Sequence, residues 1–492
     1  MLSEILVALC VVLFVIWYKT NKNNYWKKRN ILQIEDLNWI FMFSRSSLAE
    51  ICKNIYDKYD TPYIGTSMGS TPTLILKNIE DIKAVLADDF SSFYSRGMQP
   101  HPNDILADNI LFMNNLNRWK LIRHSIAPAF TSFRLKQMFY ILEKCARDLV
   151  EVVEDNKHAR KKPFSFLYTY TTASIGASII GVDIQAKNSE MDSPFLDMSW
   201  ELLKPSLKTK IRIFIANKFP KLFKALKLKI FGEHEKFFIS MLKSFMENRR
   251  RHFRITHDFV EICLQLQYKG MMQDFFTTCE ITPTTERLAA QAFAFFIAGA
   301  DTTANALHFT LIELSNNKHI LEKLHEEIDG VFGTYKEELS YNDIEKLEYL
   351  DMIISESLRM NPPIGFIQRI CTKDTVLPSN VAIEEGTAVV IPIFAIHRDD
   401  KYFSVPDLFE PERFCKDSIS EMKYMYLPFS EGNRNCIGLE MARLTMKVGL
   451  AWLLRRFTLA EQIYKPKFER HSFALRASKA YYKLIVRDLC PE

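Results

Sequence analysis

The segment FSEGNRNCIG occupies residues 429–438 and runs directly into a helical pattern at Leu439–Leu454. Cys436 therefore lies just before a helix N-terminus, where the helix dipole and free N–H groups stabilise a thiolate. Gly432 and Gly438 allow the backbone to turn tightly and to approach a flat ligand. Arg434, two residues before the cysteine, can bind an anionic group at the edge of that ligand. A cysteine thiolate is one of the few axial ligands of haem iron, and a thiolate in this position can serve as one.

A second segment, GADTT at residues 299–303, places polar groups inside a long helical pattern. The pattern contains no proline from Glu286 to about Ser315, and we expect Thr282 to cap it with Pro283 in its first turn. Residues 288–298 are apolar nearly all round, so they must be buried. A carboxylate and two hydroxyls beside them are costly unless they meet a ligand or each other. Threonine can also bond back to the preceding turn, so the sequence predicts a groove beside this helix.

The rest of the chain indicates a mainly helical fold. Apolar residues recur at spacings of three and four through most of the sequence, whereas strand-like segments are few, namely 74–76, 388–393 and 481–486. Hydrophobic residues make up 48% of the chain and charged residues 25%, which excludes a disordered or fibrous protein. We therefore expect a fold that is mainly α with a minor β region, in a single catalytic domain.

Charge and cysteine content exclude several classes of function. The chain carries 64 Lys and Arg against 59 Asp and Glu, a near balance that argues against a nucleic-acid partner. Its nine cysteines include no CxxC pair, which removes support for a zinc site or a redox dithiol. Scattered cysteines in an odd number are typical of a reducing compartment, so we expect the bulk of the chain in the cytosol.

The N-terminus carries an uninterrupted apolar run at Ile5–Tyr18, followed by five basic residues between positions 19 and 29. Positive charge after the run predicts a membrane anchor that leaves the C-terminal bulk on the cytosolic side, with a buried first helix as the alternative. No small-residue cleavage site follows, which argues against a signal peptide. We divide the chain into an anchor at 1–20, a basic linker at 21–45 and a catalytic domain at 46–492.

The lysine-rich stretch Ile211–Phe231 is either a second membrane-contacting surface or a solvated helical hairpin.

The segment at 429–438 matches FxxGxRxCxG at every fixed position and resembles the haem-binding loop of the cytochromes P-450. Four further motifs of that family occur in the family's order: WxxxR at Trp119–Arg123, AGxDTT at Ala298–Thr303, ExxR at Glu356–Arg359 and PERF at Pro411–Phe414. Together they span most of the chain. The sequence RICTKD at residues 369–374 and the phenylalanines before Gly299 resemble the insect microsomal branch of the family.

The resemblance implies a haem b (iron protoporphyrin IX) with the Cys436 thiolate as axial ligand. It places Thr302 and Asp301 on the oxygen-binding side as the catalytic pair, with Asp301 feeding protons through water. It also implies a group of haem-binding residues, most of which would hold the propionates: Arg434, Trp119, Arg123, Arg369, Phe429 and Arg96. For Arg96 a structural role is an equal alternative, because its surroundings match the family only loosely.

The resemblance further implies a structural ion-pair network of Glu356, Arg359 and Arg413 that locks the cysteine loop. Candidate substrate contacts share an apolar side chain on or near the GADTT helix, before WxxxR or after ExxR; they are Phe112, Met113, Phe295, Phe296, Ala298, Ile364 and Phe366. Each of these could instead belong to the ordinary core.

These expectations describe a membrane-bound haem-thiolate monooxygenase of the endoplasmic reticulum (microsomal) membrane with its catalytic domain on the cytosolic side. It would insert one oxygen atom from O2 into lipophilic molecules, either xenobiotics or endogenous lipids and hormones. The chain has no dinucleotide-binding motif, so electrons would come from NADPH–cytochrome P-450 reductase, with cytochrome b5 as an additional candidate. The alternatives are an isomerase or dehydratase of hydroperoxides, a haem sensor or carrier without turnover, and a helical membrane scaffold without haem.

The sequence departs from the family pattern at three places. No proline occurs between Lys19 and Asp60, where microsomal relatives carry a proline-rich hinge. Glu440–Met441 stands where relatives commonly have Arg-Phe, which lowers the positive charge expected for reductase docking. The segment His397–Asp400 has an aspartate where a proline is usual, which we interpret as a minor loop change.

Overall fold

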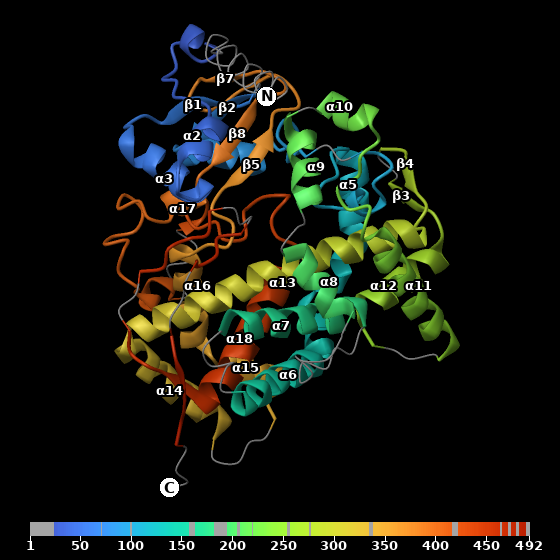
Figure 1. The fold of residues 1–492 in the computed structure, drawn as a ribbon, viewed down its shortest axis with the longest axis vertical. Helices are drawn as coiled ribbons and strands as arrows, with labels where there is room; N and C mark the ends of the chain where they lie inside the picture. Colours follow the sequence, from blue (N-terminus) through green and yellow to red (C-terminus); the bar gives the residue numbers. More distant parts are fainter. Residues whose placement is uncertain are drawn as a thin grey trace, which may run out of the picture.

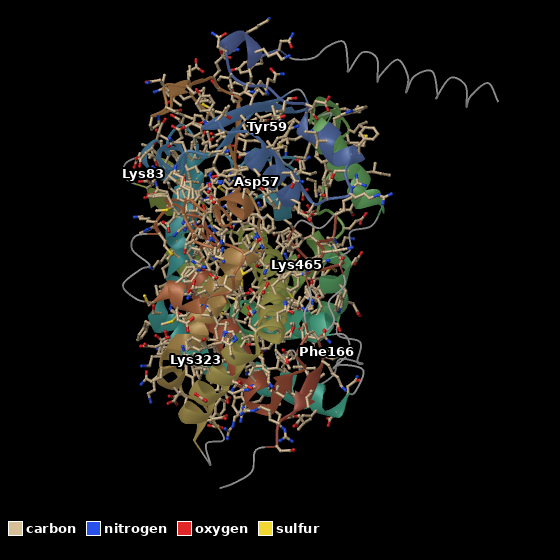
Figure 2. The ribbon with its side chains drawn as sticks, turned by 90° about the vertical axis from the view of Figure 1, so that its left-hand side faces the viewer. Asp57, Tyr59, Lys83, Phe166, Lys323 and Lys465 are labelled. Carbon is tan, nitrogen blue, oxygen red and sulfur yellow. The ribbon has the colours of Figure 1, made fainter. Side chains whose placement is uncertain are left out.

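The computed structural model describes residues 24–488, apart from 70, 99–100, 157–162, 182–193, 204–206, 219, 253–255, 275–276, 334–337, 416–421, 463–464, 471–473 and 479–481. The expected anchor at 1–20 lies outside the described residues. Within the described part of the chain, no helix combines the length and apolar character that crossing a membrane requires. A sheet region with several short helices forms one end of the molecule, and a larger helical region forms the other (Figures 1 and 2).

The helices follow one another along most of the chain. They are α2 (Leu37–Phe43), α3 (Leu48–Lys58), α4 (Ile79–Lys83), α5 (Leu116–Ile126), α6 (Ser132–Asp155), α7 (Pro163–Ile175), α8 (Pro194–Leu203), α9 (Leu207–Lys218), α10 (Pro220–Ala225), α11 (Glu235–Arg251), α12 (Phe259–Lys269), α13 (Thr285–Asn316), α14 (Lys318–Phe332), α15 (Tyr341–Glu345), α16 (Glu348–Met360), α17 (Ile393–Ile396) and α18 (Leu439–Arg456). The mainly helical expectation is therefore confirmed.

The strands are short and mostly form hairpins. They are β1 (Tyr63–Met68), β2 (Thr71–Leu76), β3 (Met272–Asp274), β4 (Cys279–Ile281), β5 (Ile367–Ile370), β6 (Thr375–Val376), β7 (Ala382–Ile383), β8 (Ala388–Ile391), β9 (Phe457–Leu459) and β10 (Leu484–Val486). The largest sheet has the order β1-β2-β8-β5, with β2 and β8 parallel and the other two pairs antiparallel. Its parallel pair brings the start of the chain beside a strand more than 300 residues later.

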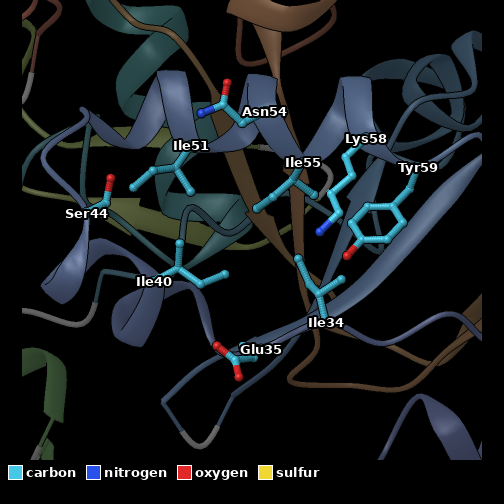
Figure 3. A pocket seen from close by; sticks show the side chains of 9 residues that line it. All are labelled: Ile34, Glu35, Ile40, Ser44, Ile51, Asn54, Ile55, Lys58 and Tyr59. Atoms are coloured by element: carbon cyan, nitrogen blue, oxygen red, sulfur yellow. The ribbon is translucent and has the colours of Figure 1, made fainter.

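Residues 24–45, the described part of the expected basic linker, pack against this sheet. The Trp26 side chain is fully buried, and its indole nitrogen donates to the Thr66 carbonyl at 2.8 Å. Only glycine fits beneath it at position 65, because an added Cβ would lie 2.4 Å from the Trp26 ring. Next to this contact, a cavity of about 370 Å³ separates α2 from α3 (Figure 3). Its lining includes no residue of the cysteine loop or of α13.

Helix α13 runs through the middle of the helical region and packs against α7, α11, α16 and α18 (Figure 1). Its 32 residues correspond to about 48 Å of helix. Most of its side chains are buried, as the apolar pattern predicts. The expected cap was wrong: Thr284 is the N-cap and its hydroxyl accepts from the Arg287 backbone. Thr282 instead accepts the Thr284 N–H through its carbonyl, which places Pro283 before the helix.

The expected network of Glu356, Arg359 and Arg413 is present and joins α16 to the 406–414 segment. Glu356 and Arg359 have no exposed side-chain surface, and two hydrogen bonds of 2.7 and 2.8 Å join them. The Arg413 guanidinium approaches the Glu356 carboxylate at 3.5 Å, and the Glu410 N–H donates to it at 2.9 Å. Because every one of these charges is paired and hydrogen-bonded, the network fixes the geometry of the surrounding loops.

His397 continues this network toward the cysteine loop. Arg359 donates to the His397 carbonyl at 2.6 Å, and the His397 ring bonds to the Arg359 carbonyl through Nδ1. The ring Nε2 accepts from the Leu427 N–H at 2.8 Å, two residues before Phe429. Burial lowers the pKa of His397 to about 3, so the ring is neutral and Nδ1 carries its proton. The imidazole thus ties α16 to the start of the loop that carries Cys436.

Replacing Glu356 with glutamine should lower the free energy of unfolding by about 3–5 kcal/mol, because Arg359 would keep a buried charge without its counter-charge. Urea denaturation followed by circular dichroism measures this loss. Glu412→Gln is the matched control in the PERF segment: Glu412 pairs with Lys323 at 2.7 Å, but both side chains are more than half exposed. That change should cost about 0–1 kcal/mol. Equal losses in the two variants would contradict the structural role of the network.

Candidate active site

The cysteine loop is closed by its own backbone. The Cys436 N–H donates to the Phe429 carbonyl at 2.9 Å, and α18 begins three residues after the cysteine. Gly432 has a φ of 76°, and a Cβ there would lie 1.9 Å from the Leu86 carbonyl oxygen, so the predicted need for glycine is confirmed. At Gly438 the φ is −97° and an added Cβ would make an ordinary 3.8 Å contact with Phe130. The backbone therefore does not require glycine at that position.

The Cys436 side chain is accessible even though protein surrounds it. The Cys436 side chain is exposed, but the surrounding protein still removes much of its hydration. This burial is the main influence on the thiol and raises its pKa above the ordinary value. Both observations fit a sulfur that faces an internal space. A hydrogen bond from Gly438 and the charges of Arg96 and Arg123 act in the opposite direction. The helix N-terminus thus favours the thiolate as expected, but in the protein alone burial outweighs it, and a bound metal cation would reverse the balance.

Four arginines gather around this loop without an acidic partner. Arg96 donates to the Arg434 carbonyl at 3.2 Å, and Arg123 donates to the backbone and side-chain oxygens of Asn435 at 3.0 and 2.6 Å. Arg434 donates to the Met113 carbonyl at 2.6 Å. Arg369 donates to its neighbour's carbonyl at 2.9 Å. Within the described ranges, none of the four forms an ion pair with Asp or Glu.

The pKa values of this arginine cluster indicate that it lacks an anionic partner. Burial is the main cause that lowers the pKa of Arg96 to about 10 and that of Arg434 to about 9, and neighbouring guanidiniums contribute to both shifts. Burial and the charges of Arg96 and Arg434 also depress the pKa of Arg369. The Arg434 Nε and Nη1 atoms and the Arg369 Nε atom are buried with no hydrogen-bond partner. Buried cations and donors in this state require an anionic ligand.

A haem fits these residues. Its two propionates would supply the anionic groups that the arginine cluster lacks, and the accessible Cys436 sulfur would supply an axial ligand. Trp119 lies beneath two of the arginines, with the Arg434 guanidinium 4.6 Å and the Arg123 guanidinium 5.5 Å from its ring centre. The tryptophan thus keeps both cations in place. Phe429 packs against the main core and contributes the carbonyl that closes the loop.

Helix α13 becomes partly exposed where the GADTT motif begins. Ala298 is exposed although residues 288–296 before it are buried. The Thr302 hydroxyl donates to the Ala298 carbonyl at 2.5 Å, the back-bond that the sequence predicted. Thr171 of α7 donates to the Ala300 carbonyl at 2.9 Å, so a second helix supports this turn. The turns that follow Ala298 therefore carry the half-buried hydroxyl of Thr302 and the largely buried carboxylate of Asp301.

Asp301 is held by two partners. Its carboxylate accepts from Asn305 of the same helix at 2.8 Å and from Arg476 near the C-terminus, also at 2.8 Å. Burial raises the pKa of Asp301, and the Arg476 charge and the two hydrogen bonds oppose that rise. Sequence reasoning missed Arg476 and His397, since neither belongs to a motif at a fixed distance from its partner.

The candidate substrate contacts separate into different environments. Phe295 packs edge-on against Phe130, and Phe296 against Phe195, with ring centres 4.8 and 4.7 Å apart. These are the contacts of ordinary core residues, the alternative weighed above. Phe112 stacks on Phe231 with ring centres 5.6 Å apart.

The remaining candidates are less uniform. Met113 is buried and its carbonyl binds Arg434. Phe366 packs against a small cluster that includes Leu37 and Ile51, whereas Ile364 is half-buried. Among these apolar candidates, the structure gives an exposed side chain only to Ala298.

Comparison with known proteins agrees with this site. A family model described as Cytochrome P450 matches residues 30–484, which include every motif described above. The chain is 29% identical to probable cytochrome P450 6a20 of Drosophila melanogaster over 95% of its length and 93% of the relative's. It is 28% identical to cytochrome P450 6k1 of Blattella germanica, with coverages of 92% and 90%, and 30% identical to cytochrome P450 6B7 of Helicoverpa armigera, with coverages of 93% and 92%. The chain therefore belongs to the cytochrome P450 family of haem-thiolate monooxygenases and resembles its insect members.

Proposed function

We propose that this monooxygenase inserts one oxygen atom from O2 into lipophilic small molecules, either xenobiotics or endogenous lipids and hormones. The observation that carries the proposal is the combination of an accessible Cys436 with four buried arginines that lack a counter-anion. Haem, when bound, supplies the activation of O2 that no side chain of this protein can perform. The chain's own residues bind that group, keep the substrate near it and deliver protons.

The roles of these residues follow from their contacts. Cys436 would be the axial ligand, and the arginine cluster with Trp119 would hold the propionates. Oxygen activation consumes protons, so a hydroxyl and a titratable carboxylate at the accessible turn of α13 suit proton delivery. Thr302 would supply the hydroxyl and Asp301 the carboxylate. A hydroperoxide isomerase would not need this pair, which favours the monooxygenase.

The proposed substrate class rests on the apolar surroundings of this turn. Ala298 offers a small exposed side chain, which leaves room for a ligand beside α13. Phe112, which precedes α5, stacks on Phe231, which lies between α10 and α11, and the Phe231 ring also lies 5.0 Å from Phe293 of α13. Phenylalanine side chains that border a bound ligand favour lipophilic molecules over polar ones, which supports the proposed substrate class.

We further propose that the enzyme works on the endoplasmic reticulum membrane, with an anchor at 1–20 and the catalytic domain at 46–492 facing the cytosol. Helices α9 and α10 support a membrane contact, because Ile211, Ile213, Leu222 and Leu226 are exposed among lysines. NADPH–cytochrome P-450 reductase would supply electrons, with cytochrome b5 as an additional donor.

Cys436→Ala should remove the axial sulfur, so the ferrous protein with bound carbon monoxide should lose the long-wavelength absorption band of a thiolate-ligated haem. Absorption spectra of the purified, haem-loaded protein measure this band. Cys279→Ala, a change to a half-buried cysteine of β4, is the control and should keep it. Persistence of the thiolate band in Cys436→Ala would show that another residue ligates the iron.

Thr302→Ala should keep that band but lower product formed per NADPH about tenfold or more, with hydrogen peroxide released instead, because a proton donor is lost. Parallel measurements of NADPH, product and peroxide test this. Thr310→Ala is the matched control: Thr310 also donates to a carbonyl one turn earlier on α13, at 2.9 Å, but lies in the buried part of the helix. Unchanged coupling in Thr302→Ala would refute the assigned role.

Deleting residues 1–20 should reduce the fraction of protein that sediments with phospholipid vesicles, while the thiolate-type spectrum stays intact. The residual binding should fall further when Leu222 and Leu226 are also changed to serine, because both side chains are exposed on or beside α10. If the truncated protein alone no longer sediments, α9 and α10 do not contact the membrane.

A further inference from the structure

Asp301 and Arg476 form a contact that the motif of α13 does not contain. The two residues are 175 positions apart in the sequence, yet an Arg476 Nη2 atom lies 2.8 Å from the Asp301 Oδ1 atom. Only 12% of the Arg476 side chain and 20% of the Asp301 side chain are exposed. A pair this well shielded is screened much less than a surface ion pair.

The backbone around Arg476 is anchored on both sides. The Leu475 N–H donates to the Pro363 carbonyl at 2.8 Å, and the Glu469 N–H donates to the Arg476 carbonyl at 2.7 Å. The guanidinium also lies 5.2 Å from the ring centre of Phe164 in α7. These contacts present Arg476 to α13 in a defined position.

Arg476 has a second carboxylate within reach. A Glu469 carboxylate oxygen lies 3.5 Å from the Arg476 Nη1 atom, and 41% of the Glu469 side chain is exposed. The Arg476 Nε atom is buried and has no hydrogen-bond partner, so the guanidinium is not locked by a full set of bonds. One cation thus lies between a buried carboxylate on α13 and an exposed carboxylate at the surface.

We propose that Arg476 is a positioning residue of the oxygenation reaction: it fixes the carboxylate of Asp301, the residue that precedes Thr302 on α13, and releases it by shifting its contact to Glu469. The released carboxylate takes one proton from bulk solvent and passes one proton toward Thr302. It then regains its charge and its contact with Arg476, so the pair returns to its starting state. The inference rests on the function proposed above.

The charges that face Asp301 come from three elements. Asn305 of α13 and Arg476 donate to its carboxylate, and Tyr168 of α7 lies close enough for the Asp301 charge to raise the pKa of its phenol, after burial as the main cause. Glu469 acts through Arg476. Burial alone raises the pKa of Asp301, and Arg476 opposes that rise. Removing Arg476 leaves only the Asn305 hydrogen bond to oppose burial, so Asp301 should gain its proton at a higher pH.

The test uses the full-length, haem-loaded protein with reductase, NADPH and a lipophilic substrate that it turns over. Arg476→Gln removes the charge, and Arg476→Lys retains it. The matched control is Arg470→Gln, because Arg470 lies in the same C-terminal segment but donates to the Phe41 and Met42 carbonyls. Two properties are followed against pH: product formed per NADPH, and the infrared band of the Asp301 carboxyl in the resting protein, assigned by its loss in Asp301→Asn.

Arg476→Gln should move both the carboxyl titration and the Asp301-dependent limb of turnover to higher pH, and should lower product per NADPH about tenfold or more. Arg476→Lys should recover most of the wild-type profile, and Arg470→Gln should match wild type. Glu469→Gln should slow turnover with the carboxyl band unmoved, because the release partner is lost while the Asp301 pair remains.

An unmoved carboxyl band and turnover limb in Arg476→Gln, with an active wild type, would overturn this proposal alone. An equal shift in Arg470→Gln would also overturn it, since the effect would then come from the segment as a whole. If wild type forms no product with NADPH and reductase, the proposed function is wrong and this inference falls with it.

Discussion

The structure depends on burying positive charge around one cysteine. Arg96, Arg123, Arg369 and Arg434 all have depressed pKa values because burial removes their hydration, and no carboxylate among the described residues offsets it. Such an arrangement is unfavourable for the protein alone and favourable with a dianionic ligand. The same ligand's iron would reverse the raised pKa of the Cys436 thiol. Without haem, both the buried arginine charges and ionisation of the Cys436 thiol are unfavourable. Haem would make both favourable, through its propionates and its iron.

The ion pair of Glu356 and Arg359 does not leave a buried charge unpaired. Glu356 and Arg359 are equally buried, but each charge meets its opposite and the remaining donors reach backbone carbonyls. Through His397 this satisfied network connects to Leu427 and so to the cysteine loop. The two clusters therefore differ in their expected roles: the network of Glu356 and Arg359 connects to the cysteine loop through His397, and we propose that the arginine cluster binds the haem propionates. The Glu356–Arg359 pair has its charges matched within the protein, whereas the buried donors of Arg434 and Arg369 have neither a carboxylate nor a full set of hydrogen bonds among the described residues.

Much of this could be predicted from the sequence, because the motifs are local. The turn at Gly432, the back-bond of Thr302 and the ion pair of Glu356 each depend on residues a few positions apart, so spacing alone determines them. Choices between close alternatives could not be predicted. Thr282 and Thr284 are equally good caps by type, and backbone geometry selected Thr284. The effect of burial on the Cys436 thiol also depends on neighbours from distant elements.

The contact between Arg476 and Asp301 could not be predicted from the sequence and became visible only in the folded structure. Nothing in its local sequence distinguishes it from other surface arginines, and only the return of the C-terminal segment beside Pro363 brings it to α13. A motif that supplies Asp301 and Thr302 specifies which groups are present but not the charge state of the carboxylate. That state is set by burial and by the nearest cation, and in this protein the cation comes from outside the motif. We therefore expect the pH dependence of proton delivery in this protein to depend on Arg476 as well as on the α13 motif.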